Sequence, residues 1–285
     1  MIKPALKDDA LLADINAAES DAQMFHLWWL GQSGFLVKWQ DKHLLIDPYL
    51  SDSLTTKYAD TDKPHVRMTQ LCIAPQRLDF IDLVTSSHNH TDHLDGETLV
   101  PLLKANKDLT VVVPAANREF AAKRLNISTD RLTTVDADSS IEAAGFTIHA
   151  IPAAHETIQR DKQGRCHFLG YVVQFGPFTI YHSGDTLFYD TMVDRLKKWP
   201  IDVAILPING RAPERRVAGN LWGREAAQLA KDIEAKLLIP CHYDMFDFNT
   251  ATPVEFTAEA ARLKQECKVL KCGERWSSNG LTGIT

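Results

Sequence analysis

The sequence predicts an α/β fold in which two β-sheets pack face to face and helices cover their outer sides. Two stretches, residues 81–125 and 186–265, alternate short apolar runs with longer helical patterns. Each of them follows a stretch of strand-like runs separated by turns, at residues 25–49 and 133–178. Sheets and helices that are apolar on one side must bury that side, and this order of elements fits two covered sheets. No linker divides the chain, so we expect one domain over residues 1–285.

The composition is that of a globular protein with an excess of acidic groups. The 285 residues are 45% hydrophobic and 24% charged, with a net charge of −6 and a pI near 6.0. An acidic balance disfavours a broad nucleic-acid surface, because phosphate binding depends on Lys and Arg. The five cysteines are scattered without a CxxC pair, which predicts reduced thiols. No run has the length of a signal peptide or membrane span, so we expect a cytoplasmic protein without nucleic acid as a partner.

The first 50 residues predict a helix followed by three strands. Leucine and isoleucine recur at helical spacing among acidic residues over residues 8–23, which predicts a short amphipathic helix packed on the body. Two apolar runs around a Gly-Gln-Ser-Gly turn predict a hairpin over residues 25–39, and KHLLIDPY at 42–49 predicts a third strand. We expect Asp47, at the end of that strand, to anchor a loop by accepting backbone N–H bonds; metal ligation is the alternative.

Residues 51–80 carry few strand or helix signals and predict a long loop. Loops of this length in a compact domain are commonly functional, so this one is a candidate wall of the active site. His65 and Arg67 lie in it and are candidates to contact an anionic substrate. The simpler interpretation is that both face the solvent.

Strands and helices alternate after this loop. Residues 81–87 predict a buried strand that ends in small polar residues. The further helices are expected at residues 97–106, 115–125, 189–198, 224–233 and 253–265. The further strands are expected at 109–113, 203–208 and 237–241, with a glycine-rich meander over 133–178.

Three histidines and an aspartate crowd into HNHTDH at residues 88–93, directly after a predicted strand. Imidazole and carboxylate are ligands that zinc, manganese and iron accept, so the segment predicts a metal site. Three more candidates follow apolar runs, where they would meet at one edge of the sheets. The seven candidate ligands are His88, His90, Asp92, His93, His155, Asp185 and His242. Seven exceed the four positions of a structural zinc site and suit a catalytic pair of ions about 3.5 to 4 Å apart.

The ordered motifs resemble those of a known family. HxHxDH, a later lone histidine, the aspartate of SGDT and a final histidine after an apolar strand resemble the metallo-β-lactamase superfamily of hydrolases. The matching stretches are WWLGQSGF at 28–35, IDPYLSD at 46–52, IYHSGDT at 180–186 and IPCHYDMF at 239–246. They are similar to the branch that contains L-ascorbate-6-phosphate lactonase. The chain lacks the longer C-terminal part associated with that enzyme, so its substrate does not follow from the resemblance.

The resemblance implies an αββα sandwich of the metallo-β-lactamase type. It implies a first metal held by His88, His90 and His155, and a second held by Asp92, His93 and His242, with Asp185 bridging them. Zinc is the first choice for the two divalent ions, and manganese or iron are alternatives. The implied activity is hydrolysis by a metal-bridging hydroxide, with Asp92 and Asp185 as catalytic residues. The substrate would be a lactone or other ester of a small anionic metabolite, with or without a phosphate group.

Other interpretations stay open from the sequence. The same ions serve a phosphodiesterase equally well, and a non-catalytic metal sensor or scaffold is the alternative from another class. Arg211 follows a predicted strand and is a candidate to clamp a phosphate or carboxylate, with a surface arginine as the alternative. Phe246 is a candidate for the mouth of the pocket. The exposed aromatics are compatible with a homo-oligomer but do not require one.

Overall fold

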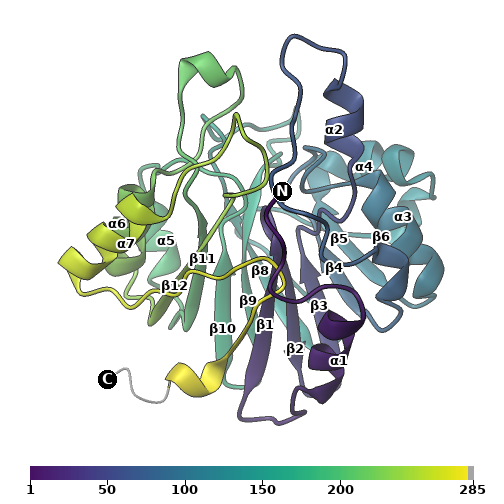
Figure 1. Ribbon diagram of the computed structural model, residues 1–285, viewed down its shortest axis with the longest axis horizontal. Helices are drawn as coiled ribbons and strands as arrows, with labels where there is room; N and C mark the ends of the chain where they lie inside the picture. Colours follow the sequence, from purple (N-terminus) through teal and green to yellow (C-terminus); the bar gives the residue numbers. More distant parts are fainter. Residues whose placement is uncertain (282–285) are drawn as a thin grey trace.

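The computed structural model describes residues 1–281, in which two mixed β-sheets pack face to face with helices outside (Figure 1). The first sheet runs in the order β13 (Arg275–Ser277), β1 (Phe25–Gly31), β2 (Gly34–Trp39), β3 (Lys42–Ile46), β4 (Leu83–Thr85), β5 (Thr110–Pro114), β6 (Leu132–Val135). The second runs β12 (Leu237–Cys241), β11 (Val203–Pro207), β10 (Phe178–His182), β9 (Leu169–Phe175), β8 (Phe146–Pro152), β7 (Ser140–Ala143). The predicted αββα fold class is confirmed.

The helices lie on the two outer sides of this sandwich (Figure 1). Beside the first sheet are α1 (Asp9–Ala17), α3 (Gly96–Ala105) and α4 (Arg118–Leu125). Beside the second are α5 (Met192–Leu196), α6 (Gly223–Asp232) and α7 (Val254–Leu263). Short 3₁₀ turns occur at Pro75–Arg77, Ala115–Asn117, Thr129–Arg131, Pro213–Arg215 and Ser278–Leu281. Within residues 1–281, none of these helices is long and apolar enough to cross a bilayer.

The core lies between the two sheets and is rich in aromatic rings. Phe25 of β1 packs edge to face against Phe175 and Phe178 of the opposite sheet, with ring centroids 5.3 and 4.9 Å apart. Aromatic pairs at this separation add to the free energy of burial. The inward faces of both sheets are therefore fixed relative to each other, which makes the sandwich a rigid support for the loops at its edge.

Helix α1 ends six residues earlier than predicted. Leu11 and Ile15 are its buried residues, as the periodicity predicted. Its C-terminal turn is held by Lys38, whose Nζ donates to the carbonyl oxygens of Ile15 at 3.0 Å and Ala18 at 2.8 Å. A cation at a helix C-terminus satisfies carbonyls that have no partner within the helix. The helix therefore stops at Ala17, where this contact replaces a further turn.

Two predictions about the chain between residues 51 and 178 were wrong in part. The predicted loop over residues 51–80 contains a helix, α2 (Ser53–Tyr58), which stands above the edge of the sandwich (Figure 1). The first strand of the predicted meander, β6, belongs to the other sheet, where it runs parallel to β5. Strands β7 to β10 form the antiparallel meander as expected.

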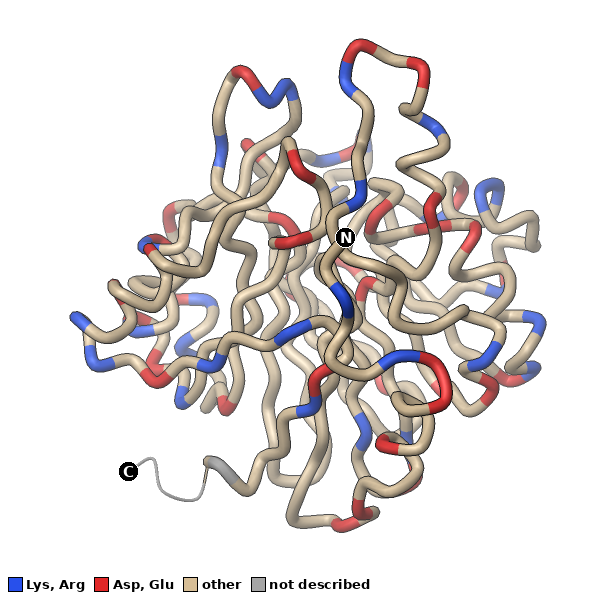
Figure 2. The backbone as a smooth tube through the Cα atoms, viewed as in Figure 1, with Lys and Arg blue, Asp and Glu red and all other residues tan. Residues whose placement is uncertain are grey.

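Loops that follow β4, β8, β10 and β12 carry the candidate ligands, and they meet at the upper edge of the sandwich in Figure 1. Two longer projections rise beside them, the loop after α2 and the loop between β11 and α6 (Figure 1). Both projections carry charges of either sign (Figure 2). Asp62 in one forms an ion pair with Arg216 in the other at 2.7 Å. The edge that holds the candidate ligands is therefore flanked by two loops that touch.

The lowered pKa of His43, on β3, predicts a measurable effect of pH on the stability of the fold. Burial is the main cause that lowers its pKa, from 6.5 to about 4, and the charge of Lys38 lowers it further. The unfolded chain takes up this proton near pH 6.5 and the folded chain only near pH 4. The contribution of neutral His43 to the free energy of unfolding is therefore fully present above pH 6.5. Up to about 3 kcal/mol of it is lost as the pH falls to 4.

We expect His43→Gln to reduce the fall in Tm between pH 6.5 and pH 4. The measurement is a series of thermal melts of both proteins with a chelator present, so that bound ions do not contribute. Equal slopes of Tm against pH in the two proteins would contradict this role of His43.

Candidate metal centre and its pocket

The segment HNHTDH turns sharply after β4, and this turn brings its side chains together. The backbone N–H groups of His93 and Leu94 both donate to the carbonyl oxygen of His90, at 3.1 and 2.8 Å. The carboxylate of Asp95 caps α3 and accepts bonds from the hydroxyls of Ser51 and Ser53, at 2.6 and 2.9 Å. The ligand loop is thus fixed between a strand end and a capped helix.

The structure brings all seven predicted ligands to one place. The groups whose ligand atoms all lie within 4.8 Å of one another are His88, His90 and His155; His88, His93 and Asp185; and Asp92, His93 and His242. The first and third groups coincide with the two sets that the resemblance implies. Asp185 lies between them: Oδ2 is 3.7 Å from Nε2 of His155 in the first group, and Oδ1 is 3.3 Å from Nε2 of His93 in the third.

The chemistry of these residues fits divalent ions. His88 Nε2, His93 Nε2 and Asp185 Oδ1 are buried and have no hydrogen-bond partner. Buried polar atoms without a partner cost free energy, so such atoms are rare unless something else binds them. Nitrogen and oxygen ligands in this proportion suit zinc, manganese or iron.

The electrostatics of the cluster prepare two of its members for ligation. Burial lowers the pKa of His88 well below 6.5, and the neighbouring imidazoles of His93 and His90 lower it further, which keeps the ring neutral. Burial raises the pKa of Asp185, but the charges of His93 and His242 outweigh this and hold it well below 3.8. A neutral imidazole and an ionised carboxylate are the forms that bind a metal.

Hydrogen bonds behind the ligands set their orientation. His93 donates from Nδ1 to Oδ2 of Asp47 at 2.6 Å, and His155 donates from Nδ1 to the carbonyl oxygen of Gly219 at 3.0 Å. Gln32 donates from Nε2 to Oδ2 of Asp92 at 2.8 Å. Such bonds fix which ring nitrogen faces the ion and aim the carboxylate.

Asp47 has the anchoring role that was favoured over ligation. Its Oδ1 accepts the backbone N–H of Ser87 at 2.7 Å, its Oδ2 accepts from His93, and the side chain is fully buried. It belongs to none of the three groups of potential ligands described above. Asp47 thus joins the end of β3 to the end of β4 and orients a ligand at the same time.

We expect Asp47→Asn to weaken metal binding by about 10- to 100-fold, because the amide no longer holds His93 as a carboxylate does. The measurement is competition for zinc with a coloured chelator. Asp82→Asn is a matched control, since Asp82 accepts the backbone N–H of His43 at the opposite end of β4. Equal zinc affinities of the Asp47→Asn and wild-type proteins would contradict the prediction.

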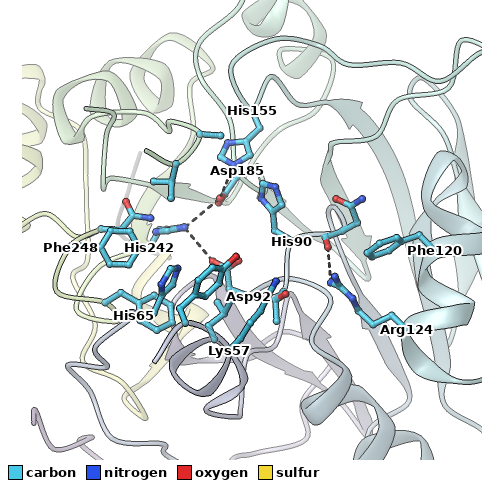
Figure 3. A pocket seen from close by; sticks show the side chains of 18 residues that line it. Lys57, His65, His90, Asp92, Phe120, Arg124, His155, Asp185, His242 and Phe248 are labelled. Carbon is cyan, nitrogen blue, oxygen red and sulfur yellow. Dashed lines mark hydrogen bonds and ion pairs between the residues drawn. The ribbon is translucent and has the colours of Figure 1, made fainter. Parts of the chain in front are cut away.

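A cavity of about 410 Å³ opens onto the ligand cluster (Figure 3). Five ligands line one side of it: His90, Asp92, His155, Asp185 and His242. A second side is aromatic, where His65 stacks on Tyr58 at 4.1 Å between ring centroids and lies 4.5 Å from the ring of Phe248. A third carries Phe120 and Arg124 (Figure 3). The candidate metal centre therefore faces a space of the size of a small metabolite.

The candidate substrate residues divide into two pairs. His65 and Phe246 line the cavity, and their contact with a substrate stays a prediction. Arg67 and Arg211 do not line it. Arg67 bonds from Nε to Oδ1 of Asp52 at 2.5 Å, so it joins loop segments instead of facing solvent or substrate.

Arg211 is likewise occupied by another partner. Its guanidinium makes a two-bond ion pair with Glu225, at 2.6 and 2.7 Å. The prediction of a phosphate clamp at this residue is therefore not supported by its position. The carboxylate of Glu225 accepts from the same two N–H donors that a phosphate would need.

Three residues of the site were not predicted from the sequence. Gln32 lies in the turn between β1 and β2, and its polar side chain between two glycines is a signal that could have been used. Phe120 and Arg124 lie on α4, where a lone aromatic and a basic residue look like an ordinary solvated surface. Their position on the cavity depends on how α4 packs beside the ligand loop.

Comparison with known proteins agrees with this geometry. A family model described as "Beta-lactamase superfamily domain" matches residues 42–243, more than half of the chain. The chain belongs to the metallo-β-lactamase superfamily. It is a metal-dependent hydrolase of that fold. The ascorbate-6-phosphate lactonase branch, the identity of the metal and the substrate stay predictions.

The similar proteins cover nearly the whole chain. A metal-dependent hydrolase from Sulfurisphaera tokodaii is 25% identical, over 88% of this chain and 98% of the relative. One from Hyperthermus butylicus is 28% identical, with the same coverage. The solved structure of a metallo hydrolase from Ignicoccus hospitalis superposes with a TM-score of 0.64 at 20% identity. The match covers 89% of this chain and 98% of the other chain. At this identity, the similarity to the solved structure concerns the fold alone.

Proposed function

We propose that this protein hydrolyses a lactone or other ester bond of a small metabolite, using water activated by two divalent ions. The observation that carries the proposal is the cavity of about 410 Å³ that opens onto the seven grouped ligands. A structural or sensing site has no need of a cavity of this kind, because its ligands close around the ion. When bound, the two ions would polarise the scissile bond and lower the pKa of a water molecule.

The residues of the chain position the reacting groups. Asp92 lines the cavity, and the bond from Gln32 fixes its Oδ2. Burial raises its pKa, but His93 and His242 lower it below 3.8, so the carboxylate is ionised and can accept a proton from the attacking water. Asp185 contacts His155 of one ligand group and His93 of the other, and its negative charge would balance both ions.

The aromatic side of the cavity favours a substrate with an apolar part. His65 and Phe246 were predicted to contact substrate, and both belong to a cluster of rings with Tyr58 and Phe248. Burial lowers the pKa of His65, so its ring is neutral at pH 7 and packs as an aromatic group. These side chains exclude water from one side of the bond to be cleaved.

The test is a hydrolysis panel on protein loaded with zinc or manganese. The panel contains a sugar lactone, its phosphorylated form, an aryl ester and an aryl phosphodiester. Cleavage of the lactones or the ester with the highest kcat/KM supports the proposal. Preference for the diester would make the protein a phosphodiesterase of the same fold, and tight metal binding without any cleavage would favour the sensor or scaffold alternative.

A further inference from the structure

One arginine on the side of the cavity has no carboxylate partner. Arg124 of α4 lines the cavity beside Phe120 and the ligand loop (Figure 3). Among residues 1–281, its guanidinium forms no ion pair within 4.0 Å, and the charges of Asp95 and Asp92 act on it only from farther away. Arg67 and Arg211, by contrast, are both paired with acidic side chains. Arg124 is thus a half-buried cation whose charge is not neutralised at short range.

The guanidinium of Arg124 is held in place on one edge. Its Nη1 donates to the carbonyl oxygens of Asn89 at 2.7 Å and Leu94 at 3.1 Å. Its central carbon lies 4.4 Å from the centre of the Phe120 ring, which orients the plane by a cation–π contact. Phe120 is 43% exposed and lines the same cavity, so its ring is accessible to a bound ligand.

The other edge of the guanidinium is available. An arginine has five N–H donors, and the hydrogen bonds of Arg124 use Nη1 alone, which leaves Nε and Nη2. Nη1 alone makes the bonds that support the ligand loop, so this support does not occupy Nε or Nη2. A planar fork with two free donors matches the two oxygens of a carboxylate or phosphate.

We propose that Arg124 binds an anionic group of the substrate, a carboxylate or phosphate, through Nε and Nη2, with the Phe120 ring under the guanidinium. The inference rests on the proposed ester hydrolysis and deepens it. The substrate then has an anionic end at Arg124 and an apolar part against Tyr58, His65 and Phe248. The scissile bond lies between these ends, against the ligand cluster.

The test compares two esters that differ only in charge. Monomethyl succinate carries a distal carboxylate, and methyl succinamate carries a neutral amide of the same shape. We expect metal-loaded wild-type protein to favour the anionic ester. Arg124→Gln should lower kcat/KM for the anionic ester by about 10- to 100-fold, mainly through KM, and change the neutral ester by less than about twofold.

Three further variants control for other effects of charge. Lys123→Gln removes the same charge from the neighbouring, exposed position of α4, outside the cavity, and should change neither ester. Lys57→Gln removes the other cation that lines the cavity and should have a smaller effect, because Lys57 is exposed. Arg124→Lys keeps the charge but not the fork, and should retain part of the preference. The phosphorylated and plain lactones distinguish a phosphate from a carboxylate as the preferred anion.

Several outcomes would overturn the inference. An equal fall for both esters in Arg124→Gln, with lower metal content, would mean that Arg124 only supports the ligand loop. Loss of the preference in Lys57→Gln and not in Arg124→Gln would move the anion site to Lys57. If wild-type protein cleaves neither ester, calorimetric binding of the intact esters decides. If wild-type protein binds the anionic ester selectively and Arg124→Gln loses this selectivity, the anion site is upheld although ester hydrolysis fails. If wild-type protein binds both esters equally, the anion site is overturned as well.

Discussion

Asp185→Asn is expected to reduce kcat by at least about 10³-fold and to lower the metal content of the protein. Asp185 is buried, and its two oxygens face His93 on one side and His155 and His242 on the other. An amide has no charge to balance two cations and offers one ligand oxygen instead of two. The measurement is turnover of the best substrate of the panel, together with elemental analysis of metal per chain.

Asp190→Asn is the control for this substitution. Asp190 is an exposed carboxylate five residues later, outside the cavity, so its amide variant should keep both turnover and metal content. A fully active Asp185→Asn protein with a normal complement of metal would refute the position of Asp185 between two ions. Loss of turnover with full metal content would place its role in proton transfer or substrate contact instead.

Removal of the ions is expected to stop hydrolysis and to lower Tm by about 10 °C. A ligand at about a thousand times its Kd stabilises the folded state by about 4 kcal/mol, and each kcal/mol shifts Tm by about 2–4 °C in a domain of this size. Without ions, the buried Nε2 atoms of His88 and His93 have no hydrogen-bond partner. The measurement is calorimetry before and after chelation, followed by reconstitution with zinc or manganese.

Asp185→Asn serves as the matched comparison for chelation, because a damaged site should show a smaller shift in Tm. Restoration of both Tm and turnover by one metal would also identify the better cofactor. Unchanged turnover in chelated protein that elemental analysis shows to be metal-free would refute a catalytic role of the ions.

The candidate ligands could be predicted from the sequence because each of them follows an apolar run. His155, Asp185 and His242 lie up to 154 residues from His88, yet each comes directly after a strand that ends at the same edge. The turn that carries the remaining ligands also follows a strand. Strands of a sandwich must bury their apolar faces, so the positions of their ends are constrained by the same pattern that predicts them.

Helix α2 shows why part of the fold was not predicted. Its sequence, SLTTKY, contains two β-branched threonines and an aromatic residue, which have weak helix propensity. The helix is held from outside: Leu54 is buried in a cluster with Tyr49 and Phe246, and its backbone N–H donates to the hydroxyl of Tyr49 at 3.1 Å. Contacts with residues nearly 200 positions away in the chain carry no local signal.

The arginines show the same limit for the site. Arg67 and Arg211 lie in predicted loops and Arg124 in a predicted helix, and nothing in the sequence marks one of them as the cation that faces the cavity. The structure pairs Arg67 with Asp52 and Arg211 with Glu225, and leaves Arg124 on the cavity beside the ligand loop. Which cation is available to a substrate depends on the acids that packing brings near it, and this is a property of the folded chain.

The sequence predicted the sandwich of covered sheets and the seven candidate ligands, because apolar periodicity marks the strands and each candidate ligand follows the end of one. The tertiary structure alone decided which sheet β6 joins, which side chains orient the ligands and which arginine faces the cavity. All three features depend on contacts between segments that are distant in the chain, and such contacts determine which hydrogen-bond partner each side chain meets. Local patterns fix which surfaces must be buried, and packing fixes what they are buried against.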